Sequence, residues 1–331
     1  MIKQDISFAG SNWVWLNGEL VPWQDATTNV STHGLNYGMG VFEGIRSYKT
    51  VDGRTGIFRL DSHIDRLFQS AEIYSLQIPY SKQALVDATL QVVKANSGGQ
   101  HSNYIRPLCW FGSGISLMHR PVETAIIAWP WKINLPEERV RAGVRVAISP
   151  WKKIHHSMLP STAKGCGQYL SSLLSVRHAL MNGCDEALLL DASGNLAEGP
   201  AENIFLVKNG KLLTNDETSS ILLGVTRASV IRIAQDLGIA VEIRTLTKED
   251  LFAADEAFFT GTAVEIVKIK DVDGKQIGSG QTPVMEQISG VFHAVTSGVN
   301  RSYGDWFQLV PLDAETSPAD VTEVAMANAS D

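Results

Sequence analysis

The stretch SMLPSTAKGCGQYLSS, residues 157–172, places a lysine in small-residue surroundings with no carboxylate within several positions. The neighbours of Lys164 are Ala163, Gly165, Cys166 and Gly167. Such neighbours let the backbone approach another group closely. An apolar run ending at Asn182-Gly183 predicts a helix directly afterwards, with Leu170, Leu173, Leu174 and Leu180 on one side. Lys164 is therefore either an ordinary loop lysine or a functional amine in a confined place.

The composition indicates a soluble protein large enough for two domains. The chain has 331 residues, of which 44% are hydrophobic and 19% charged, and its net charge is −7. This charge argues against a nucleic-acid partner. The three cysteines lack metal-ligand or redox spacing, and neither a signal peptide nor a membrane span is evident. We expect a cytoplasmic protein.

Hairpins set the expected fold class. Residues 13–21 predict two strands that turn at Asn17-Gly18, and residues 41–48 predict one strand. Ser62, with Asp65 three positions later, predicts the start of a helix. Hairpins outnumber β-α-β units, which favours two α+β domains over a doubly wound sheet.

One stretch predicts a linker between these domains. Residues 130–138, PWKINLPEE, combine two prolines with a charge cluster. We therefore expect a smaller domain over residues 1–130, a linker over 131–139 and a larger domain over 140–310. Residues 311–331 are acidic and rich in small residues, which predicts a disordered tail.

Two segments could form a phosphate-binding cup. Gly224-Val225-Thr226-Arg227 opens a helix, where free backbone N–H groups and a threonine hydroxyl can bind an anion, although an ordinary helix start reads the same way. The segment 259–263, with Thr262, is either the other wall of the cup or a turn. Arg59 ends an apolar strand, and its guanidinium requires a phosphate or a structural carboxylate such as Asp61 or Asp65.

Further candidates for acid–base chemistry lie near the lysine and beyond it. Glu198 and Glu202 are four residues apart in a glycine-proline turn and could be catalytic carboxylates, a salt-bridge partner or a turn acceptor. Tyr169 could donate a hydroxyl or simply pack. His155-His156 have no cysteine or aspartate at ligand spacing, so we expect no metal there. A lysine, tyrosine, glutamate, arginine and phosphate cup together suit pyridoxal 5′-phosphate (PLP).

An ordered set of motifs carries a family resemblance from about Trp13 to about Thr296. The motifs are residues 36–46 (NYGMGVFEGIR), 104–108 (YIRPL), 163–164 (AK), 167–172 (GQYLSS), 197–199 (AEG) with 202–203 (EN), 224–227 (GVTR) and 260–263 (TGTA) with Glu265. Together they resemble the fold-type IV PLP enzymes, specifically branched-chain amino acid aminotransferases. The resemblance implies the two-domain fold of the D-amino-acid aminotransferase type.

The resemblance also implies residue roles. Lys164 would form the Schiff base with PLP and then shuttle the proton, Tyr169 would bind the phenolic oxygen, and Glu198 would pair with the pyridine nitrogen. Glu202 would be structural. The expected phosphate ligands are Arg59, Val225, Thr226 and Thr262. The expected substrate site contains Tyr37, Phe42, Tyr104 and Arg106, with backbone donors from Thr262 and Ala263.

The implied reaction moves an amino group between a leucine-, isoleucine- or valine-like amino acid and 2-oxoglutarate, in a homodimer. Apolar walls with one arginine suit both substrates, because only the acidic one can form an ion pair. Asn134 replaces a tyrosine usual in the family, and the loop 112–120 is shorter and different. Transaminases of D-amino acids or (R)-amines, an aminodeoxychorismate lyase-like enzyme and a non-catalytic phosphate-ligand protein therefore stay as alternatives.

Overall fold

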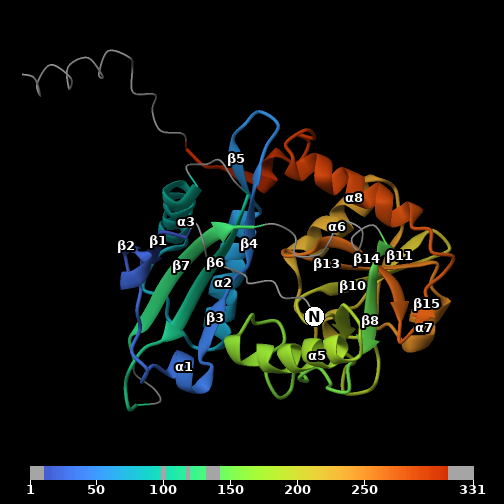
Figure 1. Cartoon of the computed structure of the whole chain (residues 1–331), viewed down its shortest axis with the longest axis horizontal. Helices are drawn as coiled ribbons and strands as arrows, with labels where there is room; N and C mark the ends of the chain where they lie inside the picture. The colour runs from blue at the N-terminus through green and yellow to red at the C-terminus, as the bar shows by residue number, and fades with distance from the viewer. Residues whose placement is uncertain (1–10, 98–101, 117–119, 132–141, 312–331) are drawn as a thin grey trace, which may run out of the picture.

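The computed structural model describes residues 11–97, 102–116, 120–131 and 142–311, which are organised around an antiparallel sheet and a mixed sheet (Figure 1). The first sheet has the order β16-β5-β4-β6-β7-β1-β2, with β3 paired to β6. Its strands are β1 (Trp13–Leu16), β2 (Glu19–Pro22), β3 (Gly40–Phe42), β4 (Ile45–Lys49), β5 (Thr55–Phe58), β6 (Asn103–Phe111), β7 (Val122–Pro130) and β16 (Phe307–Leu309).

The second sheet has the order β12-β11-β10-β13-β14-β8-β9, with β15 paired to β14. Its strands are β8 (Val144–Ile148), β9 (Glu186–Leu188), β10 (Asn203–Lys208), β11 (Lys211–Thr214), β12 (Val241–Ile243), β13 (Glu256–Gly261), β14 (Glu265–Val272) and β15 (Lys275–Gln276). A buried ion pair joins the sheets, because Arg46 of β4 lies 2.7 Å from Glu265 of β14.

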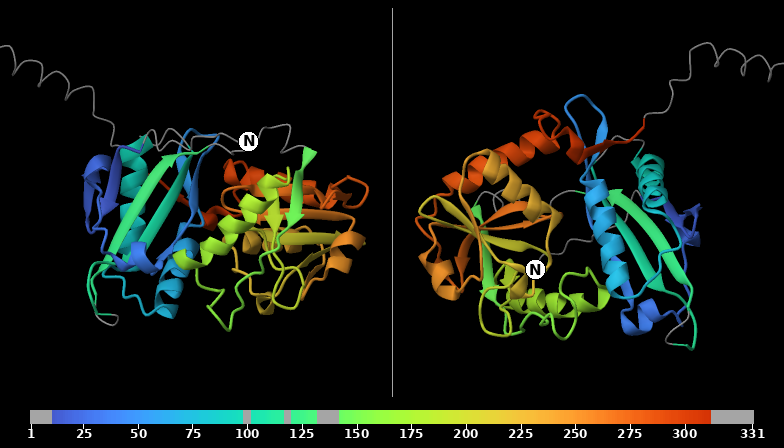
Figure 2. Two further views of the ribbon diagram at one scale, coloured as in Figure 1. Left: turned by 60° about the horizontal axis from the view of Figure 1, so that its bottom comes forward. Right: turned by 180° about the vertical axis from the view of Figure 1, so that it is seen from behind.

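Helices cover both sheets. On the first sheet, α2 (Leu60–Ile73) and α3 (Lys82–Ser97) bury leucine, isoleucine and valine side chains against β3, β4, β5 and β6. On the second sheet, α6 (Val225–Asp236) and α8 (Pro283–Thr296) lie on one side and α5 (Tyr169–Met181) on the other (Figure 2). Two further helices, α1 (His33–Tyr37) and α7 (Lys248–Ala253), are short. None of the described helices combines the length and hydropathy that a membrane span requires.

The α+β fold class is confirmed, and so is the hairpin at Asn17-Gly18, where β1 pairs with β2. The single strand predicted over residues 41–48 is wrong. Residues 43 and 44 separate β3 from β4, and position 44 needs a glycine because a Cβ there would lie 2.1 Å from the hydroxyl oxygen of Tyr104. The helix predicted from Ser62 begins earlier, at Leu60, behind Arg59 in the left-handed conformation.

The division into two domains at residues 131–139 stays a proposal, since residues 132–141 and the predicted tail over 312–331 lie outside the described residues. A buried cluster on each sheet supports it, while a third cluster joins Tyr48 and Phe58 of the first sheet to Phe205 and Phe258 of the second. One element departs from the predicted boundary. Strand β16 pairs with β5, so the chain returns to the first sheet before residue 310.

Candidate active site

Lys164 is held between the two halves of the molecule. Its backbone N–H donates to Ser70 of α2 at 2.9 Å, and its carbonyl accepts from Phe42 of β3 at 3.1 Å. The small neighbours are explained by this close approach. A Cβ at Gly165 would lie 2.5 Å from the ring of Tyr74. The confined environment predicted from the sequence is therefore real, and it fixes the lysine backbone against the first sheet.

The Lys164 side chain points into a cavity whose other walls come mainly from the second sheet and its helices. Two charged groups beside it were not expected from the sequence, Arg66 and Lys153. The remaining lining comes from residues around α5, the turn before β10, the start of α6 and the end of β13: Ser161, Ala163, Gln168, Tyr169, Ser172, Glu198, Pro200, Ala201, Glu202, Asn203, Leu222, Gly224, Val225, Thr226, Thr260, Gly261 and Thr262.

Lys164 and Tyr169 form the reactive centre of this cavity. The lysine amine lies 2.8 Å from the tyrosine hydroxyl. Burial, assisted by the positive charge of Arg66, lowers the pKa of Lys164 to about 8. Burial raises the pKa of Tyr169, so the phenol stays protonated at neutral pH. The site therefore offers an amine that can be neutral near physiological pH, beside a hydroxyl that stabilises it by hydrogen bonding.

Glu198 is the ion-paired carboxylate of the cavity. Its Oε1 lies 2.5 Å from the amine of Lys153, and its Oε2 accepts from the Leu222 N–H at 3.0 Å and the Asn203 side chain at 3.2 Å. Glu202 differs, because burial raises its pKa to about 7 and its Oε2 accepts from the Ala201 N–H at 2.9 Å. Of the two carboxylates, Glu198 is thus the one paired with a cation.

The start of α6 forms an anion-binding end of the cavity. The first intrahelical bond runs from the Ala228 N–H to the Gly224 carbonyl at 2.9 Å, which leaves the amides of the first turn for a ligand. Gly224 is required there because a Cβ would lie 2.2 Å from Asn203 Oδ1. The hydroxyl of Thr260 is buried and has no partner among the described residues.

Arg66 completes this end of the cavity. The expectation that Arg59 binds the phosphate is corrected by the structure. The structure places Arg59 away from the cavity, with its guanidinium 4.9 Å from the Trp306 ring and its Nε donating to Ser62 at 3.1 Å. Arg59 has a left-handed backbone and precedes α2, which turns its side chain toward the C-terminal strand. Arg66 lies on α2, about two turns further along, and lines the cavity.

Glu43 orients Arg66. Its carboxylate accepts from Arg66 Nε at 2.7 Å and Nη2 at 2.8 Å, and lies 2.7 Å from His63 Nδ1. Burial alone would raise the pKa of Glu43, but Arg66 and His63 outweigh burial and hold that pKa well below its usual range. Arg66 Nη1 donates to the Leu223 carbonyl at 3.1 Å. A guanidinium has five N–H groups, so two remain for a bound anion.

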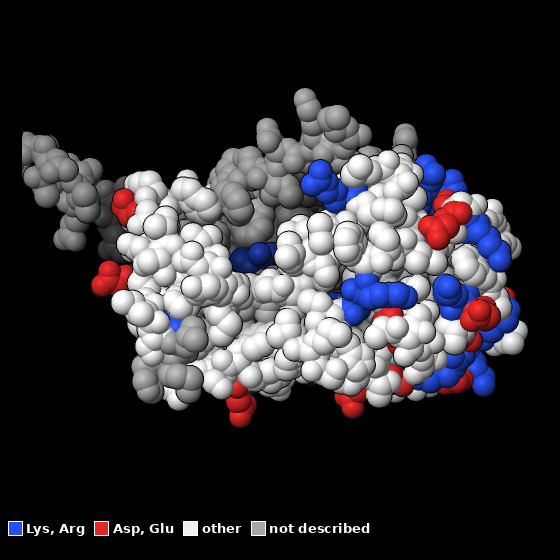
Figure 3. Space-filling view, turned by 90° about the horizontal axis from the view of Figure 1, so that it is seen from below, with Lys and Arg blue, Asp and Glu red and all other residues white. Residues whose placement is uncertain are grey.

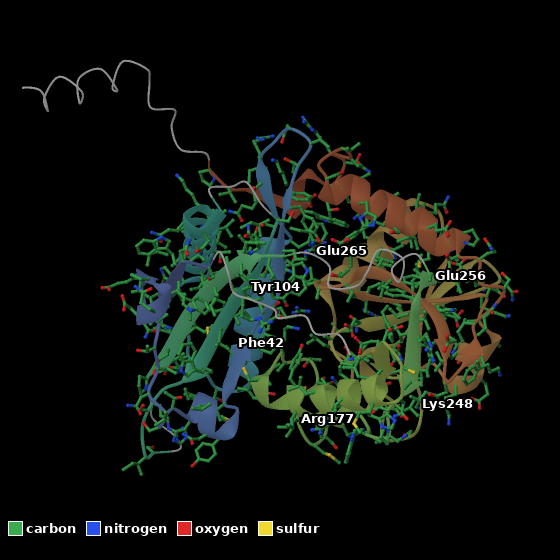
Figure 4. The ribbon with its side chains drawn as sticks, viewed as in Figure 1. Phe42, Tyr104, Arg177, Lys248, Glu256 and Glu265 are labelled. Carbon is green, nitrogen blue, oxygen red and sulfur yellow. The ribbon has the colours of Figure 1, made fainter. Side chains whose placement is uncertain are left out.

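Aromatic side chains from the first sheet lie above the lysine. The Phe42 ring lies 5.1 Å from the Lys164 amine and 4.8 Å from the Tyr169 ring. The guanidinium of Arg106 lies 4.7 Å from the Phe42 ring, and its Nη2 donates to the Tyr104 hydroxyl at 3.3 Å. Figure 4 shows Phe42 and Tyr104 on the first sheet, toward the second.

Two expected substrate residues are placed differently. Tyr37 lies in α1, is 67% exposed and packs on His33 with ring centroids 4.6 Å apart, so it does not reach the cavity of its own chain. Ala263 follows the cavity-lining Thr262 in the turn between β13 and β14, but its side chain is not part of the lining. Asn134 lies outside the described residues, as does part of the loop 112–120.

The donor set fits PLP. The helix start and the two free N–H groups of Arg66 suit its dianionic phosphate, Glu198 suits its pyridine nitrogen, and Lys164 with Tyr169 suits its carbonyl and phenolic oxygen. No group of three or more metal-ligating side chains gathers within the part of the chain that the structure describes.

The chain belongs to the family Amino-transferase class IV, whose model matches residues 40–272. It is a PLP-dependent aminotransferase. A branched-chain-amino-acid aminotransferase of Pseudomonas aeruginosa is 42% identical over 301 residues, which cover 90% of this chain and 97% of the relative.

Solved structures agree with this assignment. A branched-chain aminotransferase of Thermoproteus uzoniensis, solved with norvaline, has a TM-score of 0.86 and 40% identity, covering 91% of this chain and 100% of the other. The branched-chain amino acid aminotransferase of Thermobaculum terrenum, solved in its PLP form, has a TM-score of 0.83 and 32% identity, covering 91% of this chain and 99% of the other.

Proposed function

We propose that this aminotransferase moves the amino group of a leucine-, isoleucine- or valine-like L-amino acid to 2-oxoglutarate. The observation that carries the proposal is the juxtaposition of Lys164 and Tyr169 beside the Phe42 ring, with Glu198 lining the same cavity. An apolar amino acid suits the aromatic surface that Phe42 and Tyr104 provide. The sequence similarity to branched-chain aminotransferases supports the same substrate class.

The proposed roles follow from the donors on each wall. Bound PLP takes up the electron pair that remains when the Cα–H bond of the amino acid breaks. Lys164, when neutral, accepts that proton and returns it at the other reacting carbon. Tyr169 donates to the phenolic oxygen, and Glu198 keeps the ring nitrogen protonated. Arg66, the amides of Val225 and Thr226 and the hydroxyl of Thr262 hold the phosphate.

Arg106 is the proposed ligand for the distal carboxylate of 2-oxoglutarate. Its Nε is buried and has no hydrogen-bond partner among the described residues, and its guanidinium lies against Phe42 and Tyr104. A charged donor beside an apolar surface can bind the acidic substrate without excluding an apolar one. The backbone amides of Thr262 and Ala263 are the proposed donors to the α-carboxylate.

We also propose a homodimer that covers the exposed side of α5. Leu170 is 67% and Leu173 66% exposed, and α5 instead buries the small side chains of Ser172, Ser175 and Ala179. The predicted apolar side of this helix therefore faces outward, where Leu35 and Tyr37 of α1 are also exposed. Charged side chains are sparse on the left and central part of this face (Figure 3). A partner subunit would bring Tyr37 to a second cavity.

Sedimentation analysis tests the dimer, and Leu170→Glu with Leu173→Glu is expected to yield monomers. A wild-type monomer would contradict the proposed dimer.

The cytoplasmic location stays a prediction from composition.

A panel of amino donors with 2-oxoglutarate tests the reaction. We expect turnover with L-leucine, L-isoleucine and L-valine, and little with D-alanine or (R)-1-phenylethylamine. Preferred turnover of either of the last two would replace the proposed donor class.

A further inference from the structure

A second lysine lies in the cavity, and its position is not explained by the reaction. The amine of Lys153 lies 2.5 Å from Glu198 Oε1, and the two side chains are only 9% and 6% exposed. The backbone N–H of Lys153 donates to the Leu190 carbonyl at 2.8 Å, which fixes the segment that follows β8. Lysine is rarely buried without a charged partner. The ion pair between Lys153 and Glu198 is therefore an integral part of the site.

Three donors from separate segments fix the Glu198 carboxylate. Lys153 binds Oε1, while the Leu222 N–H and the Asn203 side chain bind Oε2. A carboxylate accepts at about four lone-pair sites, so one site stays available to a donor inside the cavity. Without a cation at Oε1, burial would favour the protonated form of this carboxyl group.

We propose that Lys153 is a positioning residue, whose ammonium holds Glu198 ionised and correctly oriented before the ring nitrogen of PLP binds. The inference rests on the proposed function only in taking PLP as the ligand. Other charged and titratable groups also face Glu198: Tyr169 of α5, Glu202 of the preceding turn, Arg66 of α2 and Arg227 of α6. Of the cationic groups that the structure describes, Lys153 is the one in direct contact with the carboxylate.

The same pair separates the roles of the two cavity lysines. Burial lowers the pKa of Lys153, but Glu198 outweighs burial and raises it, so this amine stays protonated. Lys164 has no such contact with a carboxylate, and burial lowers its pKa to about 8. A protonated amine cannot attack a carbonyl. Lys153 therefore orients Glu198, and Lys164 is left as the amine available for reaction.

Calorimetric titration of the cofactor-free full chain with PLP tests this role. Repeating the titration near neutral pH in two buffers with different ionisation enthalpies counts the protons taken up on binding. In the wild type, Glu198 is already ionised and the ring nitrogen of free PLP is already protonated near neutral pH, so this pair forms without a proton from the buffer. In Lys153→Met, Glu198 carries a proton that must leave when the protonated ring nitrogen binds, so the net proton uptake is expected to be lower than in the wild type by up to about one proton.

Matched variants separate charge from general damage. Lys153→Arg keeps the cation and is expected to keep the wild-type proton uptake. Lys152→Met removes an exposed neighbouring lysine and is expected to change nothing. Lys153→Met should also bind PLP roughly ten- to a hundredfold more weakly. Equal proton uptake in Lys153→Met and the wild type would overturn the inference. If the methionine variant does not fold, Lys153→Gln replaces it, and the same decrease in proton uptake is expected.

Thermal unfolding of the cofactor-free chain provides a test that does not depend on PLP. Lys153→Met should lower the melting temperature, and Glu198→Gln in the same chain should restore part of the loss, because it removes a buried carboxyl group that has lost its cation. The absence of any restoration would also overturn the inference. A wild-type chain that binds no PLP would instead contradict the proposed function.

Discussion

The amine of Lys164 lies 2.8 Å from the hydroxyl of Tyr169, and the Phe42 ring lies against both side chains. The first residue is held by hydrogen bonds to α2 and β3, and the second begins α5. Their contact therefore depends on how the two halves of the molecule meet. Burial gives the pair an amine with a lowered pKa and a phenol with a raised one.

The attachment of PLP to the cofactor-free chain should depend on pH through Lys164. Its pKa is lowered from 10.5 to about 8, and only the neutral amine attacks a carbonyl. The attachment rate should therefore rise with pH and level off above about pH 8, as followed by the absorbance of the bound cofactor. If the midpoint of this rise in rate with pH lies near the pKa of an ordinary lysine, burial does not lower the pKa of Lys164.

Arg66→Lys and Arg59→Lys form a matched pair for the phosphate site. Arg66 lines the cavity, and lysine keeps the charge but cannot reproduce the guanidinium N–H groups that contact both Glu43 and the phosphate. A charged hydrogen bond is worth about 1.5–3 kcal/mol, so PLP affinity should fall roughly ten- to a hundredfold. Arg59 lies against Trp306, so its replacement should leave affinity nearly unchanged. Binding of pyridoxal, which has no phosphate, serves as the control, and Arg66→Lys should affect it much less. The reverse ranking would restore Arg59 as the phosphate ligand.

Glu198→Gln should slow the chemical step far more than Glu202→Gln. The amide cannot keep the ring nitrogen protonated, and losses from removed electrostatic stabilisation are typically about 10²- to 10³-fold. Glu202 has a pKa raised to about 7, so its acid form already resembles an amide near neutral pH. Single-turnover absorbance changes measure the chemical step, with PLP still bound. A worse Glu202 variant would show that the two carboxylates are assigned in reverse.

Arg106→Leu should separate the two half-reactions. If Arg106 binds the distal carboxylate, the variant loses about 1.5–3 kcal/mol with glutamate or 2-oxoglutarate, a roughly ten- to a hundredfold loss of kcat/KM. The half-reaction with L-leucine should be spared, since its side chain carries no charge. Single-turnover measurements follow each half separately. Equal losses in both halves would instead place Arg106 at the α-carboxylate or in the architecture.

Much of the site could be predicted because its signals are local. The small residues around Lys164, the glycine before α6 and the turn containing Glu198 each occupy a few consecutive positions, and Lys164, Gly224 and Glu198 line one cavity. The fold class also followed from local hairpin signals such as Asn17-Gly18. The order of the motifs along the chain gave the family resemblance, and the resemblance implied residue roles that no single segment could indicate.

Other features depend on contacts between distant segments. Arg66 and Arg59 lie seven positions apart, and only the left-handed backbone at Arg59 and the contact of Arg66 with Glu43 decide which one faces the cavity. Lys153 gains its role from Glu198, 45 positions later. The sequence predicted an apolar side for α5 but not what covers it: Ser175 forms a hydrogen bond with Ser149 at 2.8 Å, and Leu170 faces outward. Local periodicity carries no information about which partner covers a helix.

The measurement closest to the central claim is chemical mapping of the lysine that attaches PLP. Borohydride reduction of the PLP-loaded wild type, followed by digestion and mass spectrometry, is expected to place the cofactor on Lys164. Lys164→Ala should fold normally, lose this link and lose transamination, while Lys152→Ala should keep both. Attachment at Lys153 or any other lysine, or steady-state transamination by Lys164→Ala free of wild-type enzyme, would contradict the account.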